Sequence, residues 1–137
     1  MNGVTETLAT PPRRWLRPMI LAAVVAVLGI GANRWFLRLE VEGNSMIPTL
    51  LPGDRLLFRR ITRPSGLSVG VIVALHDPRP GGDRLIVKRI TAITNGEATV
   101  RGDNPAASTD SRDFGPVALN QLPWKLVRRY NRVHGGA

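Results

Sequence analysis

The sequence contains no cysteine, and this absence removes several chemistries at once. A chain of 137 residues without cysteine has no thiol nucleophile, no disulfide and no thiolate ligand for a metal. Histidine is scarce too, since His76 and His134 are the only two. Two isolated histidines are too few for a zinc site, and a Ser–His–Asp triad would depend on His76. No phosphate-binding glycine loop occurs, so we expect neither metal nor cofactor.

Acidic residues and aromatic residues are also few. The chain has 10 Asp and Glu and 19 Lys and Arg, which gives a net charge of +9. Aromatic residues make up 5% of the chain. The basic residues, nearly all arginine, are scattered along the chain. A single-strand nucleic-acid binder needs clustered charge and stacking aromatics. We therefore expect no nucleic-acid partner and interpret the charge as that of a protein beside anionic lipid.

One long apolar run stands near the N-terminus. Residues 19–32 carry no charge, but as a helix they would reach only about 21 Å, short of the ~30 Å hydrocarbon core. Extension through Arg34 to Leu37 gives a plausible span, with Arg34 reaching to the interface. We expect a transmembrane anchor over 18–37. The alternatives are a cleaved signal peptide and an interfacial helix. The absence of a small-residue cleavage site disfavours the signal peptide.

Arginines before the run set the expected topology. Arg13, Arg14 and Arg17 precede the apolar segment, and basic residues favour the cytoplasmic side. The polar tail 1–17 is then cytoplasmic, and the rest of the chain lies outside, close to the bilayer. We expect a single-pass protein of the cell membrane.

Beyond the anchor the pattern predicts a mainly β domain over 38–130, followed by a flexible tail over 131–137. Short apolar segments alternate with Gly and Pro turns, as in antiparallel sheets. Asn95-Gly96 is the strongest hairpin turn. The expected strands are Phe36–Val41, Arg55–Arg60, Val69–Leu75, Asp83–Ile93, Ala98–Arg101 and Lys125–Tyr130.

Two segments 43 residues apart carry candidate chemistry. Lys88 lies within an apolar strand, where it shares a face with Ile86 and Ile90 while Arg89 points to the other side. Burial disfavours the ammonium and can bring the amine into the range of a general base. A lysine that reaches solvent past its apolar stem is the ordinary alternative.

Ser45 supplies the matching hydroxyl. It stands in a turn between Gly43, which tolerates backbone geometry closed to other residues, and Pro48, which fixes φ. A loop serine commonly caps its own backbone. Together, however, a hydroxyl nucleophile and a buried amine favour a serine–lysine hydrolase.

Four blocks of sequence, in order, resemble type I signal peptidases over roughly residues 41–129. They are Gly43-x-Ser45-Met46-x-Pro48-Thr49-Leu50, then Gly53-Asp54, then Val87-Lys88-Arg89, and finally Gly102-Asp103-Asn104 with Ser108-x-Asp110-Ser111-Arg112-x-Phe114-Gly115-Pro116-Val117. One Ser-Met-x-Pro would be a weak signal, but four ordered blocks are a strong one. The family's fold is mostly antiparallel β, with no room here for the accessory domain of larger members.

The resemblance implies a role for each matching residue. Ser45 attacks the scissile carbonyl and neutral Lys88 takes its proton. Ser108 orients Lys88, while Asp110 and Arg112 form a supporting ion pair. Their alternate spacing predicts that both lie on one face of a strand, where they can make a charge-assisted bond. Some members hold the oxyanion with a hydroxyl two residues before the nucleophile; that position is Gly43 here, so backbone N–H groups, chiefly that of Ser45, are expected to do so.

The sequence therefore predicts a membrane-anchored serine endopeptidase of signal peptidase I type, with an antiparallel sheet or barrel-like domain and leader-bearing precursor proteins as substrates. A protease dedicated to one precursor, such as a nickel superoxide dismutase propeptide, is an alternative that the anchor mildly disfavours. A self-cleaving repressor would need a scissile segment upstream of Ser45, commonly Ala-Gly, and that dipeptide does not occur in the sequence. A catalytically inactive membrane-tethered β module would be expected to have lost Ser45 or Lys88.

Overall fold

The computed structural model describes residues 13–131, which fall into two units divided within one helix, after Asn33. That helix, α1 (Arg13–Trp35), is long and apolar enough from Leu16 onward to span a membrane, and its large apolar side chains from Leu16 to Ile30 are exposed. The first strand follows directly at Phe36. Most of the tail predicted for 1–17, and all but the first residue of the tail predicted for 131–137, lie outside the described residues.

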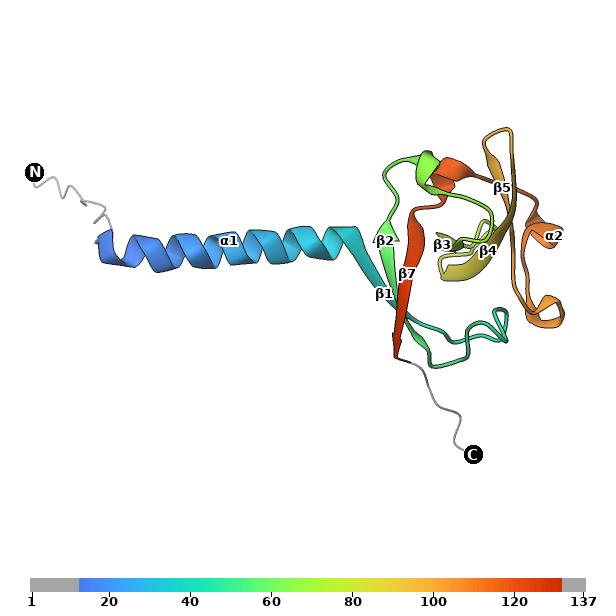
Figure 1. Cartoon of the computed structure of the whole chain (residues 1–137), viewed down its shortest axis with the longest axis horizontal. Helices are drawn as coiled ribbons and strands as arrows, with labels where there is room; N and C mark the ends of the chain where they lie inside the picture. Colours follow the sequence, from blue (N-terminus) through green and yellow to red (C-terminus); the bar gives the residue numbers. More distant parts are fainter. Residues whose placement is uncertain (1–12, 132–137) are drawn as a thin grey trace, which may run out of the picture. The chain divides into compact units, whose positions relative to one another are not determined.

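The second unit is built on one antiparallel sheet of seven strands, in the order β1-β2-β7-β3-β4-β5-β6 (Figure 1). A four-residue helix and three 3₁₀ turns connect some of these strands: α2 (Ser111–Phe114), η1 (Pro64–Gly66), η2 (Pro105–Ala107) and η3 (Leu119–Gln121). The strands are β1 (Phe36–Glu40), β2 (Arg55–Arg60), β3 (Ile72–His76), β4 (Leu85–Thr94), β5 (Glu97–Arg101), β6 (Val117–Ala118) and β7 (Trp124–Asn131).

The mainly antiparallel β fold predicted from the sequence is confirmed. The sheet is not closed, because β1 and β6 remain its two edges, so the barrel-like element of the prediction does not describe it. The turn predicted at Asn95-Gly96 joins β4 to β5 with φ of 51° and 79°, the left-handed geometry that this dipeptide favours. Strand β6 was not predicted, because two residues are too short to show an alternating pattern.

Two apolar clusters form the core, and one of them holds the serine segment. Leu56 and Phe58 alternate inward along β2, where both are fully buried. Met46 and Leu50, from the turn that follows β1, belong to the same cluster and are almost fully buried. The turn that carries Ser45 is therefore fixed to the core by Val41 before the serine and by Met46 and Leu50 after it.

We predict that Phe58→Ala destabilises the domain by about 3–5 kcal/mol, because it removes a fully buried aromatic side chain and leaves a cavity. Urea unfolding, followed by circular dichroism, measures this. The matched control is Val127→Ala on β7, whose side chain is 51% exposed and whose loss should change the free energy of unfolding by no more than about 0.5 kcal/mol. Equal losses in the two variants would contradict the assignment of this core.

Candidate active site

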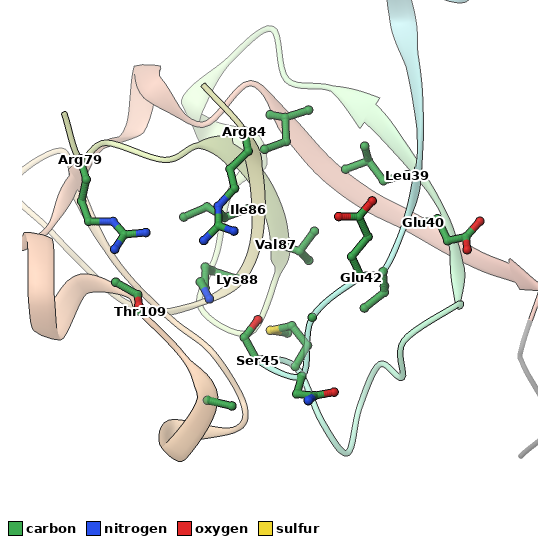
Figure 2. Close-up of a pocket in the computed structure, with 16 residues that line it drawn as sticks. Leu39, Glu40, Glu42, Ser45, Arg79, Arg84, Ile86, Val87, Lys88 and Thr109 are labelled. Carbon is green, nitrogen blue, oxygen red and sulfur yellow. The ribbon is translucent and has the colours of Figure 1, made fainter. Parts of the chain in front are cut away.

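A cavity of about 500 Å³ lies between two walls that are far apart in sequence. Residues Leu39 to Met46 form one wall, and Arg84 to Lys88 at the beginning of β4 form the other. Figure 2 shows Ser45 and Lys88, one from each wall, pointing toward the same space. The structure thus brings together the two residues that the sequence singled out.

Backbone contacts fix the turn that presents Ser45. The Asn104 N–H donates to the Ser45 carbonyl at 2.8 Å, and the Asn104 side-chain amide donates to the Asn44 carbonyl at 3.1 Å. The Ser45 side chain is half-buried. Within residues 13–131, neither its hydroxyl nor its backbone N–H takes part in a hydrogen bond. Both groups therefore remain available to a bound molecule.

Lys88 is the buried cation of the site. Its side chain is 4% exposed, with fully buried Ile90 two residues further along the strand. The ammonium donates to the Ser108 hydroxyl at 3.0 Å. On the opposite face of β4, Arg89 forms a two-pronged ion pair with Asp103, at 2.9 and 2.7 Å. Strand alternation thus separates the two neighbouring cations, as the sequence pattern predicts.

A chain of hydrogen bonds continues from Ser108 away from the cavity. The Ser108 hydroxyl donates to the Asp110 carboxylate at 2.8 Å, and the Gly102 N–H donates to the same carboxylate at 2.9 Å. The Arg112 guanidinium holds Asp110 through two bonds, at 2.9 and 2.7 Å. Asp110 is fully buried, so these donors compensate for the loss of water around its charge.

Burial lowers the pKa of the Lys88 amine from its ordinary value, and nearby Arg84 acts in the same direction. The negative charge of Asp110 opposes this shift. The pKa of Asp110 lies far below its ordinary range, because Arg112, the Gly102 N–H and Ser108 all favour the carboxylate over the acid, despite burial. The site thus shifts the amine toward its neutral form, beside a carboxylate that stays ionised except at acidic pH.

Asp110 and Arg112 were expected on one face of a strand, and this expectation is wrong. Asp110 is the N-cap of α2, where its side chain accepts the Arg112 N–H at 3.2 Å. Asp113 completes a capping box by accepting the Asp110 N–H at 2.9 Å. The alternate spacing suggested a strand, but a short capped helix brings residues two apart together equally well.

The glycine that the site requires is Gly102 rather than Gly43. Gly43 does not adopt positive φ, and a Cβ there would meet no neighbouring atom. A Cβ on Gly102 would collide with the Ser108 side chain and come within 2.5 Å of the Ser45 carbonyl. Gly102 therefore allows the turn of Ser45 and the Ser108 loop to approach closely. In the sequence, the position of Gly102 in the Gly-Asp-Asn block was the signal that could have identified it.

Sequence reasoning also missed a second charged group at the cavity. Arg79 and Arg84 line it, and buried Asp77 accepts two hydrogen bonds from the Arg79 guanidinium, at 2.9 and 2.6 Å. Arg84 lies 3.8 Å from the same carboxylate. Arg79 lowers the pKa of Asp77 to about 2. These residues lie in a Pro- and Gly-rich loop, whose course the pattern of the sequence does not specify.

Comparison with known proteins assigns this β domain and its cavity to a family. Residues 13–98, more than half of the chain, match the model of the signal peptidase family, peptidase S26. The chain belongs to this family, as its resemblance to type I signal peptidases predicted. The matched region contains Ser45 and Lys88 and ends before Ser108.

Two relatives from Arabidopsis thaliana support the assignment. The mitochondrial ATP-independent inner membrane protease subunit 1a is 32% identical, with 66% of this chain and 67% of the relative covered. Subunit 1b of the same protease is 29% identical, with 81% and 79% covered. Both relatives are membrane protease subunits.

We predict that the Asp110 carboxylate stabilises the fold only above acidic pH. Its folded pKa lies below the unfolded value near 3.9, so its contribution is present above that value and is lost as pH falls toward the folded pKa. Asp110→Asn should lower the free energy of unfolding by about 2–4 kcal/mol at pH 7, and this deficit should shrink between about pH 5 and pH 2.

Denaturant unfolding of both proteins across that pH range measures the difference, and taking the difference removes the contribution of other carboxylates. Asp83→Asn is the control, since this exposed residue forms no ion pair within the described chain. It should shift stability by about 0.5 kcal/mol or less at every pH. A deficit for Asp110→Asn that stays constant with pH would contradict the prediction.

Proposed function

We propose that this protein is a membrane-anchored serine endopeptidase that removes leader peptides from exported precursor proteins, with Ser45 as nucleophile and Lys88 as general base. One observation carries the proposal: Ser45 faces the same cavity as a buried lysine whose amine is held by Ser108. Membership of the signal peptidase family and the names of the relatives support the same reading.

The reaction is acyl transfer through an ester on Ser45. The hydroxyl oxygen attacks the scissile carbonyl carbon while neutral Lys88 accepts the hydroxyl proton. The protonated amine then donates to the nitrogen of the leaving peptide, and the C–N bond breaks. A water molecule, deprotonated by the same amine, then attacks the ester carbonyl carbon. The bond from that carbon to Ser45 Oγ breaks, and the ammonium returns its proton to Oγ. The free Ser45 N–H lies at the nucleophile and would donate to the oxyanion.

The supporting residues position the base. The Ser108 hydroxyl accepts a hydrogen bond from the Lys88 amine and donates one to the Asp110 carboxylate. Arg112 fixes the Asp110 carboxylate, so that Ser108 has one preferred orientation. None of these three side chains needs to touch the substrate, because each acts through its neighbour.

The cavity suits an extended peptide. Residues Leu85 to Lys88 pair with β3 on one side, while β5 begins to pair only at Arg89. Across the cavity, β1 is an edge strand that pairs with β2 alone among the described strands. Two free strand edges thus line the cavity, and a peptide in β conformation can bond to such edges.

The membrane assignment rests on α1 and on the relatives. Helix α1 has the length and composition of a single span, and both relatives are named as inner membrane proteases. We propose that α1 anchors the chain in the cell membrane, with the β domain on the extracytoplasmic side. A protease dedicated to one precursor uses the same site and differs only in its range of substrates.

Ser45→Ala should abolish precursor processing, by at least about a thousandfold, and leave the fold intact, because it removes only the nucleophile. Cells depleted of the protein are supplied with wild type or variant, and the N-termini of exported proteins are determined by mass spectrometry. Ser68→Ala, an exposed serine outside the cavity, should restore processing fully. Mature N-termini in the Ser45→Ala cells at more than a few per cent of wild type would remove Ser45 from its role.

Activity of the purified chain should rise with pH as Lys88 loses its proton, with a midpoint below the ~10.4 of free lysine. A peptide spanning a junction identified in those cells serves as substrate for kcat/KM across the pH range. Lys88→Arg should be inactive, because a guanidinium stays protonated, whereas Ser108→Ala should lose less activity. Near-normal turnover by Lys88→Arg would place the base elsewhere, with His76 as the first residue to test.

A further inference from the structure

A second pocket, of about 270 Å³, shares no lining residue with the cavity at Ser45. It is formed where the last residue of α1, the end of β2 with its following turn, and the start of β7 meet. Its lining includes Trp35 and four cations, Arg59, Arg60, Arg63 and Lys125, and includes no carboxylate.

The strand register places two of these cations against each other. Arg59 on β2 lies directly opposite Lys125 on β7, and opposite Phe36 on its other side. Like charges at directly opposed positions destabilise a sheet. An anion bound between Arg59 and Lys125 would relieve this repulsion, and nothing in the described chain supplies one.

Most other arginines of the domain have a different environment. Six of them each form an ion pair with a carboxylate: Arg55, Arg79, Arg84, Arg89, Arg112 and Arg129. None of the four cations of the second pocket does so within residues 13–131. Arg60 stacks over the Trp124 ring at 5.9 Å, and Lys125 donates to the Gly66 carbonyl at 3.1 Å. These partners are neutral, so the positive charge of the pocket remains uncompensated.

We propose that this pocket binds the phosphate of an anionic phospholipid headgroup. Guanidinium groups bind phosphate in two-pronged geometry. The chain itself brings the pocket to the bilayer, because Trp35 both lines the pocket and ends the apolar helix. Trp35 and Phe36 are 52% and 43% exposed, and such aromatics favour the membrane interface. The proposal depends on the anchor in the proposed function and is independent of the Ser45–Lys88 chemistry.

Native mass spectrometry of the full-length protein in mild detergent tests the proposal, with titration by short-chain phosphatidylglycerol, phosphatidylcholine or inorganic phosphate. Wild type should retain phosphatidylglycerol in preference to the other two. One Lys or Arg beside an anionic surface contributes about fivefold, so the double variant Arg59→Gln with Lys125→Gln should bind phosphatidylglycerol about twentyfold more weakly. Arg38→Gln, exposed on β1 and outside the pocket, should lose no more than about fivefold.

Thermal unfolding of the same proteins gives a second readout. Phosphatidylglycerol should raise the Tm of wild type more than that of the double variant, whereas without lipid the double variant should be at least as stable, because opposed like charges are removed. Three results would each overturn the proposal. Wild type could retain phosphatidylglycerol and phosphatidylcholine equally, or it could bind only inorganic phosphate tightly. Alternatively, Arg38→Gln and the double variant could lose the same share of their affinity for phosphatidylglycerol. Lys88→Arg, which should be inactive as a protease, should bind phosphatidylglycerol as wild type does. A failure of the lipid proposal can therefore be told apart from a failure of the proposed protease function.

Discussion

The site depends on keeping the amine of Lys88 out of water without giving it a direct negative partner. A carboxylate in contact with the amine would stabilise the ammonium and raise its pKa. Instead, Ser108 separates the amine from Asp110, and Arg112 balances the charge of Asp110. The amine is therefore oriented by a hydrogen bond while burial still favours its neutral form. The proposed base is held in place by a shell of hydrogen bonds around Ser108 and Asp110.

That shell links segments that no local pattern connects. The Asp110 carboxylate accepts from Gly102 and Arg112, and Gly102 in turn lies against the Ser45 turn. The Asn104 N–H then bonds to the Ser45 carbonyl. The proposed nucleophile, the proposed base and the residues that hold them thus share one network of contacts. A change in any of these loops acts on the relative position of Ser45 and Lys88 rather than on one residue alone.

The distribution of charge differs between the two pockets of the domain. At the proposed catalytic cavity, the two arginines that line it, Arg79 and Arg84, are both paired with Asp77. Near the end of α1, the cations of the second pocket lack such partners within the described chain. Pairing fixes geometry, which catalysis requires. Uncompensated charge instead favours an anionic partner, which the surface of a membrane supplies.

The antiparallel β class, the Asn95-Gly96 turn and the apolar helix could be predicted from the residues alone, because periodicity and turn chemistry are local properties. The same holds for Lys88 and Arg89 on opposite faces, since alternation in a strand is fixed. Other features depend on contacts between distant segments: Asp110 caps a helix, the sheet stays open, and Gly102 rather than Gly43 is sterically required. The fold likewise brings Asp77 to Arg79 and Arg84. These features arise from contacts between loops, and loop courses follow from packing against distant strands rather than from the residues of the loop alone.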